Sequence, residues 1–271
     1  MKNKINIALI ALLAMFITSC SDDNSIQTEE ITESKVASFE DYFEFLNTET
    51  NGSVIVQSVK TPLSNEAFMA SSSINGNKQP LALKVDENTV SFTNYQYSET
   101  ANKSYSNVNL EDMSTVFGNQ FSVDVTPEQI IASRNSSSSN DSNIESVYIP
   151  NLINAQFAGL SNGKIVVGSQ ISWNFDSQNE NGVVIGLEYN PLSQLEESIV
   201  SQKSDRLLKG VTLADSGTYT ITAQDLAEFP SNSMLTFYVG RAGYNIATDD
   251  SGSDYSLAGL TVSRADLQIV K

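Results

Sequence analysis

The chain of 271 residues contains no histidine and a single cysteine, at position 20. Histidine is the commonest general base and the commonest transition-metal ligand in proteins, so its absence excludes the catalytic and metal centres that depend on it. A single cysteine also excludes a disulfide within the chain. The sequence therefore lacks the side chains on which many familiar active sites are built.

Basic residues are also scarce, with 15 Lys and Arg against 32 Asp and Glu and a net charge of −17. Lys2 and Lys4 fall within the first 19 residues, so the chain from position 20 onward has 13 basic and 32 acidic residues, a net −19. Nucleic-acid binding needs cationic side chains that neutralise phosphates, so we expect no nucleic-acid partner. With 40% hydrophobic and 17% charged residues, the composition indicates a folded chain.

Residues 1–19 have the pattern of a secretory signal peptide. Two lysines precede the apolar segment 7–17, which is shorter than the roughly 20 residues that span a membrane. The sequence Ile17-Thr18-Ser19-Cys20 resembles the bacterial lipobox, an aliphatic residue and two small residues before an acylated cysteine. The resemblance implies cleavage before Cys20 and a lipid anchor on Cys20. The alternative is an ordinary signal peptide with an incidental cysteine.

Ser21, Asp22 and Asp23 follow the lipobox directly. They resemble the acidic export tag that Bacteroidota-type bacteria place after the lipidated cysteine of surface lipoproteins, which implies the outer membrane and display at the cell surface. The alternative is a polar linker that begins with two aspartates. Because residues 20–38 are polar and rich in Glu, Thr and Ser, we interpret them as a flexible tether after the lipidated cysteine.

Short β-rich segments with turn signals between them dominate from residue 51 onward. Asn-Gly pairs, which favour type I′ hairpin turns, occur at 51–52, 75–76, 162–163 and 181–182. Helical signals are brief, with a capped turn at 222–225 and a short helix within 190–200. The pattern predicts an all-β fold of antiparallel β-sandwich architecture.

Residues 133–143 form a run of Ser, Asn, Arg and Asp with no apolar side chain. Because such a run cannot contribute to a core, we expect it to link two domains. The body then divides into an N-terminal β-rich domain, 39–132, and a C-terminal sandwich, 144–271. The alternative is a long exposed loop within one larger sandwich.

The C-terminal part resembles immunoglobulin and fibronectin type III domains. The resemblance is carried by Ile171-Ser172-Trp173 on one predicted strand and by Asp215-Ser216-Gly217-Thr218-Tyr219 farther along the chain. It implies an immunoglobulin-like sandwich with Trp173 in the core and a tyrosine corner, in which the Tyr219 hydroxyl fixes a loop at the sandwich end. Ile221 stands where immunoglobulins have a cysteine, and the resemblance implies no catalytic residue.

The sequence favours neither of two enzyme classes, the serine hydrolases and the carboxylate-dependent glycosidases. Gly159-Leu160-Ser161-Asn162-Gly163 matches the nucleophile elbow of serine hydrolases, but that motif needs a histidine, and Asn162-Gly163 is explained by a hairpin turn. A carboxylate-dependent glycosidase needs two acids facing each other across a cleft, which a sequence does not reveal. We therefore predict that the chain is not an enzyme, with the glycosidase as an alternative.

Calcium is the cofactor to which the sequence points, although the leading expectation is no cofactor. Asp249, Asp250 and Asp254 surround a glycine and hydroxyl residues, an arrangement of oxygen ligands that calcium prefers. Residues 176–182 have a second such spacing, with Asp176, Gln178 and Glu180. Neither segment has the full alternating acidic pattern, so solvated turns are the competing interpretation.

Tyr95, Tyr97 and Tyr105 are candidates for stacking on a ligand, because exposed tyrosines bind sugars and protein surfaces alike. Burial of these rings in a bulged strand is the competing interpretation. The leading hypothesis is a surface-exposed, lipid-anchored outer-membrane protein that acts in non-enzymatic binding or adhesion. Its ligand at the cell surface would be a protein or a glycan, and a glycan-binding accessory role in nutrient uptake is the alternative.

Overall fold

The structure, a computed structural model, describes Phe45 and residues 48–61, 64–75, 77–78, 81–85, 88–92, 96–98, 103–105, 115–125, 130–134, 146–248 and 251–271. The all-β prediction is confirmed, since the described residues form strands and only three short helical segments after Phe45. These segments are η2 (Pro191–Ser193), α3 (Glu197–Val200) and α4 (Ala223–Leu226). The predicted helix within 190–200 is thus two separate turns.

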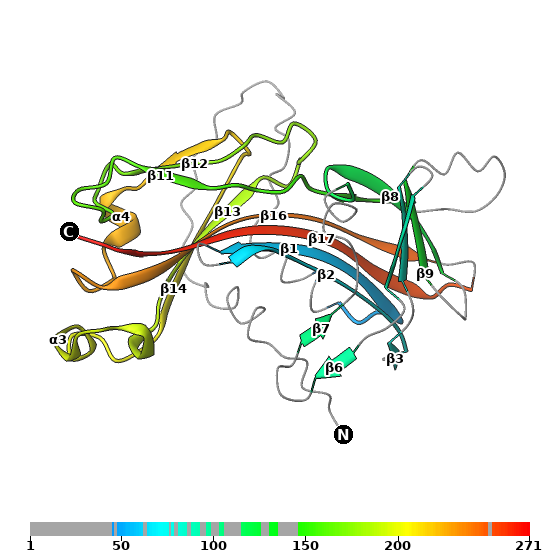
Figure 1. The fold of residues 1–271 in the computed structure, drawn as a ribbon, viewed down its shortest axis with the longest axis horizontal. Helices are drawn as coiled ribbons and strands as arrows, with labels where there is room; N and C mark the ends of the chain where they lie inside the picture. The colour runs from blue at the N-terminus through cyan, green and yellow to red at the C-terminus, as the bar shows by residue number, and fades with distance from the viewer. Residues whose placement is uncertain are drawn as a thin grey trace, which may run out of the picture.

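A seven-stranded sheet in the order β14-β13-β16-β17-β1-β2-β3 runs along the molecule (Figure 1). Its strands are β1 (Gly52–Thr61), β2 (Ser64–Ile74), β3 (Asn77–Lys78), β13 (Val183–Tyr189), β14 (Leu207–Leu213), β16 (Met234–Thr248) and β17 (Asp254–Gln268). All neighbouring strands are antiparallel except β1 and β17, which pair in parallel from Gly52↔Tyr255 to Lys60↔Ser263.

Three smaller sheets complete the described fold. A five-stranded sheet, β10-β8-β9-β4-β5, contains β4 (Leu81–Val85), β5 (Asn88–Phe92), β8 (Asn119–Val125), β9 (Ile130–Arg134) and β10 (Ser146–Ile149). A three-stranded sheet contains β11 (Gln156–Ala158), β12 (Gln170–Ser172) and β15 (Thr218–Thr220), and a two-stranded sheet contains β6 (Gln96–Ser98) and β7 (Lys103–Tyr105). The parallel pair β4–β9 makes the five-stranded sheet mixed, as β1 and β17 make the seven-stranded sheet mixed, so the prediction of purely antiparallel sheets is wrong for the two larger sheets.

The seven-stranded sheet contributes to two separate hydrophobic cores. One core joins it to the five-stranded sheet, with Val56 and Leu257 packed near Phe121 and Ile149. The other core joins it to the three-stranded sheet, and the rings of Phe157 and Phe237 meet there at 5.5 Å in an edge-to-face arrangement. The hairpin of β16 and β17 contributes residues to both cores, so two sandwiches share one pair of strands.

Strands from both sides of the segment 133–143 enter each of the two larger sheets, since β10 pairs with β8 and β17 pairs with β1. The boundary at that segment stays a prediction. From β11 onward, the first, second and fifth strands form one sheet and the fourth, third, sixth and seventh belong to the other. Immunoglobulin constant domains place the fourth strand with the first, second and fifth. Here β14 pairs with β13 instead.

Candidate functional site

A buried ion pair lies where the two sandwiches meet. Arg241 occupies an inward-facing position of β16, and its side chain is fully buried. Its Nε donates to Oδ2 of Asp215 at 2.6 Å, and its Nη2 donates to Oδ1 at 3.2 Å. Asp215 belongs to the connection between β14 and β15, so the bidentate pair ties that connection to the shared hairpin.

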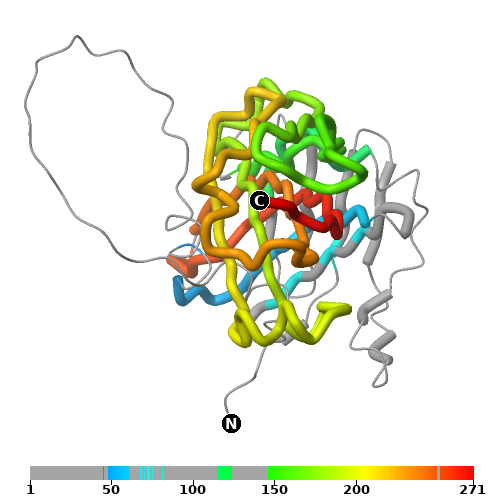
Figure 2. The backbone as a smooth tube through the Cα atoms, turned by 90° about the vertical axis from the view of Figure 1, so that its left-hand side faces the viewer, coloured from blue at the N-terminus to red at the C-terminus, as the bar shows by residue number. Residues whose placement is uncertain are grey.

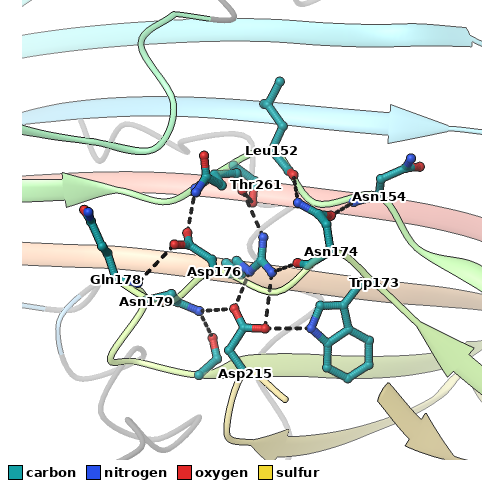
Figure 3. A network of polar contacts seen from close by, with 12 residues as sticks. Leu152, Asn154, Trp173, Asn174, Asp176, Gln178, Asn179, Asp215 and Thr261 are labelled. Carbon is teal, nitrogen blue, oxygen red and sulfur yellow. Dashed lines mark hydrogen bonds and ion pairs between the residues drawn. The ribbon is translucent and has the colours of Figure 1, made fainter. Parts of the chain in front are cut away.

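Each of the two carboxylate oxygens of Asp215 also accepts a second hydrogen bond (Figure 3). Trp173 Nε1 donates to Oδ1 at 2.8 Å, and Asn179 Nδ2 donates to Oδ2 at 3.2 Å. Nη1 of Arg241 donates to the backbone carbonyl of Asn151, and Nη2 donates also to the backbone carbonyl of Asn174. Two buried charges are tolerated only when they are paired and hydrogen-bonded in this way.

Asp176 forms a second part of the same network. Its carboxylate is buried and accepts hydrogen bonds from the Tyr148 hydroxyl at 2.9 Å, the Asn151 backbone N–H at 2.9 Å and the Gln178 backbone N–H at 3.2 Å. Burial, strengthened by the hydrogen bond to this carboxylate, raises the pKa of Tyr148 well above its usual range. The oxygens of Asp176, which the sequence offered as calcium ligands, here accept bonds from protein donors. The metal prediction at 176–182 remains untested.

Two glycines of the β16–β17 hairpin allow the end of β10 to pack directly against the hairpin backbone. Gly243 of β16 pairs with Gly259 of β17. A Cβ on Gly243 would overlap the carbonyl oxygen of Tyr148, and a Cβ on Gly259 would lie 2.8 Å from the Cα of Ile149. The end of β10 therefore contacts the hairpin backbone itself. The glycine pair and the network therefore both connect the two sandwiches. We call the region of Arg241, Asp215, Gly243 and Gly259 the joint.

An exposed pair of leucines lies in the connection between β13 and β14. Leu192 and Leu195 are each 93% exposed, whereas Ile199 of α3 is buried. The conformation of this connection is fixed by Gln194, whose side-chain amide accepts from Met234 N at 2.8 Å and donates to Met234 O at 2.9 Å. The loop thus presents two apolar side chains to solvent from a well-defined backbone, and we call these two residues the leucine pair.

No family model, curated protein or solved structure matches this chain. Among the predicted site residues, Cys20, Ser21, Asp22, Asp23, Tyr95, Asp249 and Asp250 lie outside the described residues.

The other predicted residues have defined positions. Tyr97 of β6 stands opposite Ser104, and Tyr105 of β7 stands opposite Gln96, so the two tyrosines occupy successive positions of one ladder. Asp254 begins β17, and its Oδ1 accepts a hydrogen bond from Thr248 Oγ1 at 2.7 Å across the hairpin end. Within the described ranges, no group of three or more Asp, Glu, Cys or His side chains is arranged to hold a metal ion.

The prediction for Gly159–Gly163 is confirmed as a hairpin turn. Asn162 and Gly163 have positive φ values of 51° and 75°, and Ser161 and Lys164 exchange backbone hydrogen bonds of 3.0 Å.

Trp173 lies in the core as predicted, but Phe175 is 62% exposed because β12 ends at Ser172. None of the helices that the structure describes is long and apolar enough to cross a membrane.

Tyr219 lies on β15, and its hydroxyl donates to Asp225 Oδ2 of α4 at 2.7 Å. Asp225 also closes a capping box with Thr222, so the tyrosine fixes the turn that leads into β16. Burial, followed by this hydrogen bond, raises the pKa of Tyr219 to about 12.

Sequence reasoning missed the Arg241–Asp215 pair. The signal was an arginine at the inward position that follows Leu235, Phe237 and Val239 at alternate residues.

Proposed function

We propose that this chain is a lipid-anchored outer-membrane protein displayed at the cell surface, where it acts as a rigid, non-enzymatic binding or adhesion module. The lipobox-like sequence ending at Cys20 and the acidic residues that follow it support the anchor and its location. The absence of histidine from the whole sequence supports a binding role rather than catalysis.

The leucine pair is the observation that carries the adhesion role. Leucine side chains at 93% exposure contribute nothing to the core of the protein that bears them. The hydrogen bonds of Gln194 already fix this loop, so a contact with a partner would cost little additional conformational entropy. An apolar pair on a preorganised loop is typical of a small contact that a protein partner covers.

The position of the leucine pair also suits a contact made away from the joint. Figure 1 places α3 near one end of the seven-stranded sheet, beside β14. The Arg241–Asp215 pair and the Gly243–Gly259 pair stiffen the region between that end and the other sandwich. A stiff body would hold the leucine pair at a fixed distance from the sandwich that contains the five-stranded sheet, and the flexible tether would let the whole body reorient at the membrane.

Display and adhesion are tested on intact bacteria that express the full chain. Wild-type protein is expected to incorporate labelled palmitate and to be cleaved by externally added protease, and Cys20→Ala is expected to lose both. Cells are then applied to surfaces coated with mucin, collagen or fibronectin, and attachment to at least one is expected. At equal display, the double variant L192S/L195S should return attachment to background, while V167S, at a 52% exposed apolar residue elsewhere, should not.

The double variant is also expected to keep the wild-type thermal midpoint, because exposed side chains change stability by only about 0.5 kcal/mol. Attachment that persists in L192S/L195S would remove the leucine pair from the contact. Attachment no better than that of cells without the protein would refute adhesion. Hydrolysis of chromogenic glycosides by the purified protein would contradict the non-enzymatic role.

A further inference from the structure

The outward side of the three-stranded sheet carries no charged side chain. Alternate residues of β11, β12 and β15 form two cross-strand rows, one of Gln156, Ser172 and Thr218 and one of Ala158, Gln170 and Thr220. Five of these six residues are exposed, and Ser172 is half-buried. We call these six residues the amide face. In Figure 1 its strands lie on the upper side of the molecule, above β16 and β17.

The polar side-chain groups of the amide face have no hydrogen-bond partners within the described part of the chain. Its two glutamine amides and its two threonine hydroxyls make no hydrogen bond to any described residue. Each amide offers two donors and one acceptor, and each hydroxyl offers one donor and two lone pairs. The three strands span about 10 Å, so these groups form one continuous array of unused donors and acceptors.

An exposed aromatic ring lies next to this array. Phe175 is 62% exposed and follows β12 by three residues. Its Cβ lies 3.9 Å from the position that a Cβ on Gly217 would occupy, and Gly217 directly precedes the first residue of β15. An exposed phenyl ring whose Cβ lies this close to the start of β15 supplies an apolar surface near one end of the strands that carry the amide face, on which a flat, weakly polar ring can stack.

We infer that the amide face, with Phe175, binds an uncharged polysaccharide. Sugar rings present hydroxyl donors and acceptors at their edges and C–H groups on their faces, which match the free amides and hydroxyls and the phenyl ring. The chain carries a net −19 from position 20 onward, so an anionic polysaccharide would be repelled, and the face has no cation to offset that repulsion. A protein partner is disfavoured because the centre of the face has no large apolar or arginine anchor.

This inference rests on the proposed binding role, but it concerns a different surface from the leucine pair. The sequence placed the candidate sugar contacts on Tyr95, Tyr97 and Tyr105, and the amide face is independent of those residues. The two surfaces belong to different elements, the leucine pair to the connection between β13 and β14 and the amide face to β11, β12 and β15, whose part of the chain Figure 2 shows in green to yellow. Variants of one surface should therefore leave binding at the other unchanged.

The test uses the full-length lipidated protein, purified in detergent and run in native gels that contain laminarin, xyloglucan, mannan or polygalacturonate. Retardation is expected in at least one of the three uncharged polysaccharides and not in polygalacturonate. Gln170→Ala removes the central amide and Phe175→Ala removes the ring, and each should raise the dissociation constant about tenfold. L192S/L195S serves as the matched surface control and should leave the constant unchanged.

Retardation by no uncharged polysaccharide, or retardation that Q170A and F175A leave unchanged, overturns the inference. Thermal midpoints of both variants should equal that of the wild type, because both side chains are exposed. If the gels show no binding while cell attachment still depends on the leucine pair, only the amide face is refuted. If the gels show binding and the protein also cleaves glycosides, the amide face stands and the non-enzymatic role falls.

Discussion

Replacing Asp215 with alanine should weaken the protein more than any surface substitution, because it leaves a guanidinium buried without its counter-ion. The side chains of Arg241 and Asp215 are 0% and 3% exposed. Removing one member of such a pair typically costs about 3–5 kcal/mol. Trp173 Nε1 and Asn179 Nδ2 would lose their acceptor as well. We therefore expect Asp215→Ala to lower the free energy of unfolding by about 4 kcal/mol.

The chain supplies both the probe and the control for this measurement. Trp173 is the single tryptophan, and it contacts Asp215 directly, so its fluorescence during urea unfolding reports on the joint itself. The control is the pair of Arg264 and Asp266, at 3.2 Å but with side chains 41% and 44% exposed. Asp266→Ala should cost only about 0–1 kcal/mol, since solvent screens exposed pairs.

A double-mutant cycle separates the charge effect from the loss of packing. Adding Arg241→Met to Asp215→Ala removes the stranded charge, so the double variant should be more stable than Asp215→Ala alone. The reasoning is refuted if Asp215→Ala costs no more than Asp266→Ala at an unchanged urea dependence. It is also refuted if Arg241→Met brings no recovery in the Asp215→Ala background.

Two further predictions concern the shared hairpin and its neighbouring turn. Gly243→Ala would push a methyl group into the Tyr148 carbonyl and should cost about 3 kcal/mol or more, whereas Gly240→Ala, whose nearest contact would be 3.4 Å, should change the unfolding free energy by about 1 kcal/mol or less. Equal urea midpoints for Gly243→Ala and Gly240→Ala would contradict the close contact between Gly243 and the Tyr148 carbonyl. The pKa of Tyr219 rises from 10.0 to about 12 on folding, so its contribution is complete below pH 10 and is lost as the pH rises toward 12. Tyr219→Phe should flatten the fall in urea midpoint over that range, and an unchanged slope would argue against this linkage.

Local patterns predicted the elements whose partners lie nearby in the sequence. The β-branched and aromatic residues of the segment 183–189 predict a strand there, and β13 has the same bounds. Asn162-Gly163 forms the predicted turn because both residues have positive φ values. The Asn-Gly pair at 51–52, however, does not form a hairpin turn, and Gly52 begins β1. Asn51 instead donates its backbone N–H to Asp254 O and accepts a hydrogen bond from Asn75 N, and Gly52 pairs with Ile74 of β2.

The second half of β16 and nearly all of β17 escaped prediction for a physical reason. From the apolar pattern alone, we predict strands over 235–240 and 267–270, whereas β16 and β17 run Met234–Thr248 and Asp254–Gln268. Arg241, Gly243 and Gly259 interrupt the apolar alternation there. They are explained by a crossing segment roughly 100 residues away in the sequence, at Tyr148–Asn151. The candidate joint depends on those same contacts, so the local pattern could mark Arg241 as unusual but could not reveal its partners.

The shared hairpin also determines when the chain can fold. The N-terminal strand β1 hydrogen-bonds to β17, and β17 is the last strand that the structure describes. Each sandwich needs residues of β16 and β17 to close its core, so neither can close before the hairpin is available. Pairing of such distant segments is intrinsically slow. A chain that crosses a membrane N-terminus first would therefore remain unfolded during transit and would fold only once its final strands had arrived.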